Sequence, residues 1–232
     1  MIIAMLLAHL VGDYILQWDA LALAKSRSFK GVFWHSVIVA LVTWTFALPF
    51  SQSVWWTGIL FISLTHFLID VTQLWFKPSI APLARYTLDQ ILHFTVIGLA
   101  LIWGGFVDVS GIVSWVTAVS HDKIMLLYLL GYAFITMPAW VFIKFLAYGL
   151  VSGTAPNFPE GTNKYVGIIE RMLITTFAVL GQFLLIPLAT LPRLALEWPK
   201  FAGEERTTVY IVELLASIAL ATVIGVALSQ MR

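Results

Sequence analysis

Residues 53–76 of this chain read SVWWTGILFISLTHFLIDVTQLWF. The stretch contains no Lys, Arg or Glu, and it exceeds the ~20 mostly apolar residues that a helix needs to cross a bilayer. It therefore predicts a transmembrane helix. Its ionisable residues, His66 and Asp70, are costly in lipid, and their i,i+4 spacing places them on one helix face, one turn apart. That face indicates a polar site inside the membrane.

The rest of the chain has the same character. Hydrophobic residues make up 60% of its 232 residues and charged residues only 11%, whereas a soluble domain is about 25% charged. We expect an all-α, polytopic transmembrane helical bundle of about seven spans, at residues 1–18, 31–50, 53–76, 87–107, 124–151, 164–191 and 208–230. The first span has no Lys or Arg before Lys25. Since a signal peptide begins with a basic segment, we expect a retained helix there.

Composition also excludes several functions. The net charge is +1 and no basic stripe is present, so no nucleic-acid partner is expected. The chain has no Cys, which excludes disulfides, thiolate zinc sites, iron–sulfur clusters and cysteine nucleophiles. Any metal ion must therefore be held by His, carboxylate or water ligands.

Four of the five histidines lie in the first four predicted spans, together with three aspartates. These residues form the predicted His/Asp cluster: His9, Asp13, His35, His66, Asp70, Asp89 and His93. Three His–Asp pairs have i,i+4 spacing, and their order reverses in the fourth span, which runs the opposite way across the membrane. At a rise of 1.5 Å per residue, all seven side chains then fall at similar depth. We predict that they face one another as metal ligands, and imidazole with carboxylate suits a divalent transition metal such as zinc, iron or manganese.

The first four spans also contain an internal repeat. The matching segments are Leu7–Asp13 with Leu64–Asp70, and those that begin at His35 and His93. They predict two tandem parallel hairpin repeats related by an axis along the membrane normal. The repeat is imperfect, because Gly31 stands at the position equivalent to Asp89.

The repeat divides the chain into a His/Asp-bearing four-helix unit, 1–107, and a three-helix C-terminal membrane unit, 108–232. Lys and Arg are more frequent in the predicted loops 19–30 and 77–86 than in the loops on the other side. Basic loops favour the cytoplasm. The cluster is therefore predicted to lie in the cytoplasmic leaflet.

Other polar residues have less specific assignments. Three glutamines adjoin the cluster and either support its side chains or face lipid headgroups: Gln17, Gln73 and Gln90. Three charged residues of the fifth and sixth spans predict a structural ion pair, Lys144 with Glu170 or Glu170 with Arg171. Glu213 has no obvious partner in the sequence, and Lys25 is expected to set topology and contact lipid.

The cluster residues carry a resemblance to a known family. The opening LAHLVGDYILQ at residues 7–17, the Lys25 region, His35, the Thr65–Asp70 segment and the Asp89–His93 segment resemble the bacterial membrane-protein family of domain of unknown function 3307. The resemblance implies a multi-pass protein of the bacterial inner (plasma) membrane and no particular activity. A looser likeness, through His-x3-Asp pairs, is to membrane-bound metal-dependent hydrolases.

Three functions remain open from the sequence. The first is an intramembrane metal site, with a metal-dependent hydrolase acting on lipid-linked or other membrane substrates as its catalytic form. The second is a proton- or ion-translocating protein that uses the same residues. The third is a non-catalytic accessory subunit, whose partners are the lipid bilayer and other membrane subunits and whose His–Asp pairs hold helices together.

Overall fold

The computed structural model describes residues 1–50, 55–76, 79–107, 121–158, 163–201 and 206–231. Within these ranges the chain is helical and contains no strand, as the sequence predicts. The helices form two compact units. The first unit comprises Met1–Ile80 with Arg85–Leu126, and the second comprises Ala81–Ala84 with Leu127–Arg232. The division predicted at residue 107 stays a prediction.

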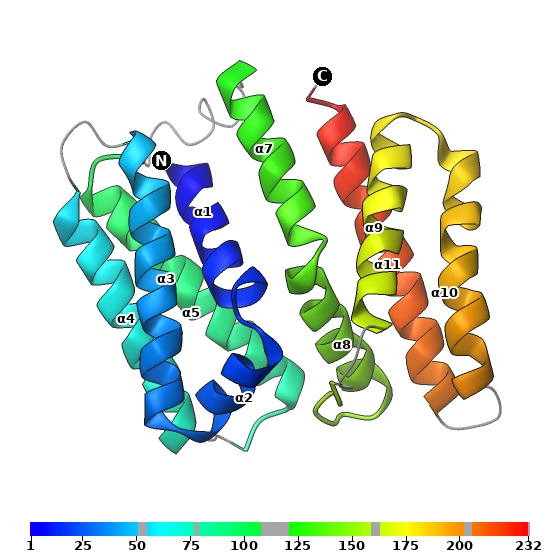
Figure 1. Ribbon diagram of the computed structural model, residues 1–232, viewed down its shortest axis with the longest axis horizontal. Helices are drawn as coiled ribbons and strands as arrows, with labels where there is room; N and C mark the ends of the chain where they lie inside the picture. The colour runs from blue at the N-terminus through cyan, green and yellow to red at the C-terminus, as the bar shows by residue number, and fades with distance from the viewer. Residues whose placement is uncertain (51–54, 77–78, 108–120, 159–162, 202–205, 232) are drawn as a thin grey trace. The chain divides into compact units, whose positions relative to one another are not determined.

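The first unit is built on four helices that lie side by side in Figure 1: α1 (Ile2–Leu10), α3 (Phe29–Ala47), α4 (Trp56–Trp75) and α5 (Pro82–Trp103). α1 continues into a π-helical turn, Val11–Ile15. Small and branched apolar residues fill the space between these helices, among them Ala8, Ile62, Ala100 and Leu101. The exposed outer faces carry large apolar side chains, as expected of helices whose solvent is lipid.

A short helix, α2 (Asp19–Arg27), follows the π-helical turn at an angle of 88° to it. The side chain of Ser28 accepts a hydrogen bond from the backbone N–H of Gly31 at 3.0 Å and so caps α3. A Cβ atom built on Gly31 would lie only 2.1 Å from the carbonyl carbon and oxygen of Ala24. The start of α3 can therefore lie against α2 only because residue 31 is glycine.

The second unit contains α7 (His121–Phe134) from Leu127 onward, α8 (Met137–Val151), α9 (Asn163–Val179), α10 (Ile186–Phe201) and α11 (Arg206–Ser229). α7 and α8 form one broken helix with a bend of 46°. Pro138 stands in the first turn of α8, where its missing N–H cannot continue the hydrogen bonding of α7. The predicted span 124–151 is thus bent at Pro138.

The predicted span 164–191 is wrong as a single helix. α9 ends at Val179, Gly181 has φ +72°, and α10 begins at Ile186. Figure 1 shows α9 and α10 as neighbouring antiparallel helices joined by this turn. Gly181 reverses the chain because glycine adopts positive φ without steric cost. Consequently Pro187 begins a helix instead of bending one, and most of the predicted 192–207 loop lies in α10.

Within the described residues, four helices are long and apolar enough to cross a membrane: α3, α4, α5 and Thr207–Ser229 of α11. The count rises to six if each bent pair, α1 with α2 and α7 with α8, forms one span. The seven predicted spans are not confirmed. The structure supports a polytopic helical membrane protein with fewer helices of full spanning length.

Candidate metal centre

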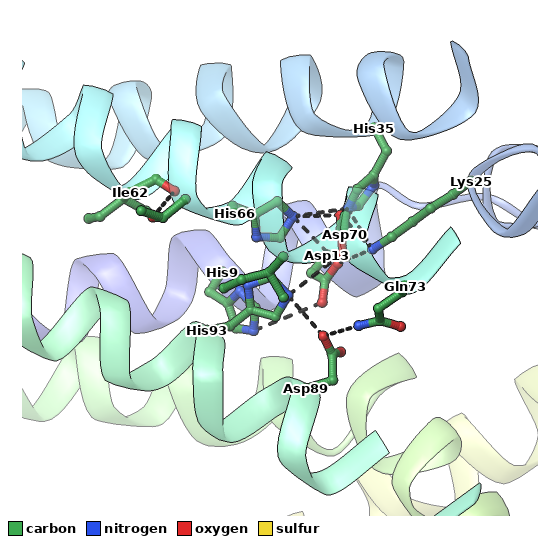
Figure 2. Close-up of polar contacts among 12 residues, drawn as sticks. His9, Asp13, Lys25, His35, Ile62, His66, Asp70, Gln73, Asp89 and His93 are labelled. Atoms are coloured by element: carbon green, nitrogen blue, oxygen red, sulfur yellow. Dashed lines mark hydrogen bonds and ion pairs between the residues drawn. The ribbon is translucent and has the colours of Figure 1, made fainter. Parts of the chain in front are cut away.

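The side chains of the His/Asp cluster converge in the interior of the first unit (Figure 2). α1 supplies His9 and its π-helical extension supplies Asp13, α3 supplies His35, α4 supplies His66 and Asp70, and α5 supplies Asp89 and His93. All are buried except Asp89, whose side chain is 16% exposed. Burial of this many ionisable groups demands that each have a partner, because an unpaired charge in this environment is costly.

The three i,i+4 pairs are present. His66 Nε2 lies 3.2 Å from Asp70 Oδ2, and His93 Nε2 lies 3.3 Å from Asp89 Oδ1. The separation between His9 Nε2 and Asp13 Oδ2 is longer, 3.9 Å. Asp13 belongs to the π-helical turn, where the offset between neighbouring turns differs from that of an α-helix.

Five cluster residues form two groups with ligand atoms close enough to hold one ion: Asp13 with His35 and His66, and His66 with Asp70 and His93. In the first group His35 Nε2 lies 3.0 Å from Asp13 Oδ1 and 3.2 Å from His66 Nε2. Two ligands of a tetrahedral zinc ion with bonds of 2.0–2.1 Å are roughly 3.3 Å apart. Two of the three separations are near this value, and the third, from Asp13 Oδ1 to His66 Nε2, is longer at 4.0 Å.

His66 belongs to both groups, and this limits how many ions they can hold. A neutral imidazole has one lone pair, and every contact of His66 within the cluster is made by Nε2. That atom can therefore bind one ion at a time. The geometry fits one ion that uses His66 as a ligand better than two ions that each require it.

Asp70, like Asp13, lies within 4.0 Å of three histidines of the cluster. Besides His66, its carboxylate lies 3.5 Å from His35 Nε2 and 3.7 Å from His93 Nε2. Asp70 Oδ2 has a cationic neighbour, Lys25 Nζ at 2.9 Å. Among the described side chains, Asp70 Oδ1 and His93 Nε2 are buried without a hydrogen-bond partner, and these two atoms are the ones that a further cation would satisfy.

His9 and Asp89 stand beside these groups and are held by glutamines. Gln73 and Gln90 both donate amide hydrogen bonds to the carboxylate of Asp89, the one from Gln90 at 2.9 Å. The amide oxygen of Gln90 then lies 3.2 Å from His9 Nε2. An amide oxygen only accepts, so His9 must carry its proton on Nε2, which removes that lone pair from metal binding.

These contacts refine the predicted roles of the glutamines. Gln73 and Gln90 form hydrogen bonds with residues of the cluster. Gln17 makes no hydrogen bond with the cluster among the described residues, and its Oε1 is buried without a hydrogen-bond partner.

Lys25 is part of the site, and the sequence prediction missed it. Its Nζ lies 2.9 Å from Asp70 Oδ2, 3.2 Å from Asp13 Oδ1 and 3.1 Å from His35 Nε2. Figure 2 shows the side chain reaching from α2 into the cluster. The prediction of a topology determinant in contact with lipid therefore needs correction: the 88° bend before α2 turns Lys25 back toward the helices that carry the aspartates.

A small cavity adjoins the histidines. His9, His66 and His93 line one side, and apolar residues that include Met5, Ile62 and Ile97 line the rest. It has room for about one water molecule. A ligand the size of water could therefore lie next to the imidazoles.

The second unit contains a separate network of buried charges. Lys144 Nζ lies 2.8 Å from Glu213 Oε1, so Glu213 has a partner that the sequence did not suggest. Glu170 Oε2 lies 3.0 Å from Arg193 Nη1. Arg171 instead donates to backbone carbonyls at the break between α7 and α8, from Nε to Ile135 at 2.6 Å and from Nη2 to Thr136 at 3.1 Å.

The predicted pairing of Lys144 or Arg171 with Glu170 is therefore replaced by one network and one separate site. Arg193 joins Glu170 at 3.0 Å to Glu213 at 3.8 Å, and Glu213 also binds Lys144, whereas Arg171 donates to backbone carbonyls. Arg193 was assigned to a loop in the sequence prediction. It lies in α10 because the turn at Gly181 starts a new helix, and this placement brings it to Glu170.

Apolar helices with an interior cluster of imidazoles and carboxylates define a class: helical membrane proteins with a buried site able to bind metal. The chain belongs to the family described as "Protein of unknown function (DUF3307)", whose model matches residues 1–124. The matched range contains the whole His/Asp cluster and Lys25. Comparisons with curated proteins and with solved structures found no match. The looser likeness to metal-dependent hydrolases stays a prediction.

Proposed function

We propose that this protein is a membrane metalloprotein of the bacterial inner membrane and that its His/Asp cluster binds one divalent transition ion. The observation that carries the proposal is the convergence of imidazoles and carboxylates from different helices in two groups, Asp13 with His35 and His66, and His66 with Asp70 and His93, with the ligand atoms of each group within 4.8 Å of one another. Imidazole with carboxylate is a ligand set that suits zinc, iron and manganese.

Elemental analysis of the detergent-purified chain tests this proposal. We expect about one zinc, iron or manganese ion per chain, since His66 Nε2 supplies one lone pair. The double variant H66A/D70A removes a residue from each ligand group and is expected to purify without the ion. H121A, which changes the fifth histidine of the sequence, is the matched control and should retain it. A wild-type chain that carries no transition metal after chelator-free purification would contradict the proposal.

The water-sized cavity favours a catalytic form of this site. A water beside His9, His66 and His93 would be close enough to the ligand groups to complete the coordination of an ion, and a metal-bound water is a nucleophile at neutral pH. Asp89 does not line the cavity, but its Oδ1 lies 3.3 Å from Nε2 of His93, which does. It is the most exposed acid of the cluster, so it is the candidate to exchange protons with such a water through His93. We propose a hydrolase that acts on lipid-linked or other membrane substrates.

Release of headgroups from a panel of lipids, presented with the purified chain in mixed micelles, tests the catalytic form. We expect D89N to abolish turnover and to change the melting temperature little, because asparagine preserves the shape of the side chain. D19N, at an exposed position of α2, is the control and should remain active. Undiminished turnover in D89N would exclude the proposed role of Asp89.

The contacts of Lys25 favour a second candidate function, a structural one. Its ammonium joins Asp13 on the extension of α1 to Asp70 on α4, and such a network can hold helices together without an ion. An accessory subunit of this kind would melt at the same temperature with and without a chelator. The metalloprotein is expected to lose stability when the ion is removed.

A further inference from the structure

The position of Lys25 has a consequence for metal binding, which rests on the proposed function. The ammonium lies within 3.2 Å of Asp13 Oδ1, His35 Nε2 and Asp70 Oδ2. The first two residues belong to one candidate ligand group and the third belongs to the other. Lys25 therefore contacts atoms that a metal ion in either group would need.

Lys25 and a metal ion cannot share His35. The Nε2 atom has one lone pair, and the ammonium at 3.1 Å donates to it. An ion coordinated by His35 requires the same lone pair. Coordination therefore excludes this hydrogen bond, and the ammonium must leave its position when the ion binds.

Charge points the same way. Asp13 and Asp70 are the two most buried carboxylates of the cluster, and Lys25, which contacts both, brings one permanent positive charge against their two negative charges. A divalent ion would neutralise both. Asp89 is stabilised separately by the amide donors of Gln73 and Gln90, so it does not need the ammonium.

The fold allows the side chain of Lys25 to move while its helix stays in place. The close contact between Ala24 and Gly31 fixes α2 against α3. The side chain of Lys25 is 21% exposed, so it already reaches toward solvent, and its long flexible stem lets the ammonium swing outward.

We propose that Lys25 is a tethered cation that competes with the metal ion for the site. It balances the buried carboxylates when the ion is absent and is displaced when a divalent ion binds. This competition lowers the affinity of the site for divalent ions. It also disfavours monovalent ions, because replacing the ammonium with one of them adds no positive charge to the site.

Zinc titration of the chelator-stripped, full-length chain in detergent, with a competing zinc dye, tests the proposal. K25M keeps the apolar stem and removes the charge, and it is expected to bind zinc at least about tenfold more tightly than the wild type. K25R keeps a permanent charge and should bind no more tightly than the wild type. K30M, at an exposed lysine at the start of α3, is the matched control and should leave the affinity unchanged.

Melting temperature gives a second readout, because binding to the folded state stabilises it by an amount that rises with the logarithm of the ligand concentration divided by Kd. K25M should melt below the wild type without zinc and should gain more from added zinc. If K25M cannot be prepared without zinc, K25Q replaces it, since its amide can still donate to Asp13. Equal or weaker zinc binding by the uncharged variant would overturn the proposal and leave the metal site standing. Zinc binding by neither protein, with both folded, would overturn the proposed function as well.

Discussion

Replacing Arg171 by methionine tests how the second unit stabilises its broken helix. Arg171 is almost completely buried at 1% exposure, and its guanidinium donates to the carbonyls of Ile135 and Thr136 at 2.6 and 3.1 Å. The Ile135 carbonyl follows the end of α7, where carbonyls lack a partner within the helix, whereas the Thr136 carbonyl also accepts from the backbone N–H of Trp140 at 3.2 Å. A hydrogen bond from a charged donor contributes about 1.5–3 kcal/mol, so loss of two of them should cost about 3 kcal/mol or more.

In a chain of this size, 1 kcal/mol corresponds to a change of about 2–4 °C in melting temperature. R171M is therefore expected to melt about 6–12 °C below the wild type in detergent. R171K keeps the charge but not the forked donor geometry, so its melting temperature should lie between those of R171M and the wild type. R27M, at an exposed arginine of α2, is the control. If R171M melts within about 2 °C of the control, the guanidinium does not stabilise the break and the reasoning fails.

Three further predictions concern the first unit. G31A would place a Cβ 2.1 Å from the backbone of Ala24. Overpacking of this kind costs about 1–3 kcal/mol, so G31A should melt below the wild type. A Cβ at residue 98 meets no atom within 4 Å, so G98A should melt like the wild type. H9A should retain the metal ion and H35A should lose it, because Gln90 engages the Nε2 atom of His9; elemental analysis in which both variants behave alike would contradict this assignment. Acid should release the metal ion, because a protonated imidazole has no lone pair for it; stepwise dialysis followed by elemental analysis would show occupancy falling with pH, and constant occupancy down to pH values at which imidazoles are charged would argue against histidine ligation.

The sequence located most of the cluster because its signal is local. Two residues at i and i+4 of a helix share a face whatever the helix packs against. The pairs His66 with Asp70 and Asp89 with His93 could therefore be predicted without knowledge of how the helices pack. Their common depth followed from the helical rise alone. The sequence could not show which histidines are candidate metal ligands and which only lie beside them. That distinction depends on the amide of Gln90, which lies between His9 and Asp89.

Lys25 could not be placed from the sequence, because its position depends on the direction of α2. A basic residue after a spanning helix usually reflects topology. Here an 88° bend turns the chain back, and glycine at residue 31 lets α2 approach α3. Two signals pointed to this region: the family resemblance includes the residues around Lys25, and Gly31 stands where the repeat predicts an aspartate, at the point where α2 lies against α3.

The helices of the second unit were predicted less well because Gly181 reverses the chain within a predicted span. The apolar run 164–191 has the composition of a single span, and Gly181 is its only strong turn signal before Pro187. The reversal at Gly181 moves Arg193 from a loop into a helix. The ion pairs then follow from packing between helices distant in sequence, which periodicity cannot predict.

X-ray absorption spectroscopy at the zinc edge, on the full chain purified and loaded with about one zinc ion, tests the central claim most directly. A metal centre of His and Asp ligands predicts a first shell of nitrogen and oxygen at about 2.0–2.1 Å, with the outer-shell scattering of imidazole rings. The same preparation of H35A should retain too little zinc to give this first shell, and the spectrum recorded on H121A should match that of the wild type. A wild-type shell of oxygen alone, without imidazole scattering, would contradict the claim that this cluster binds the metal.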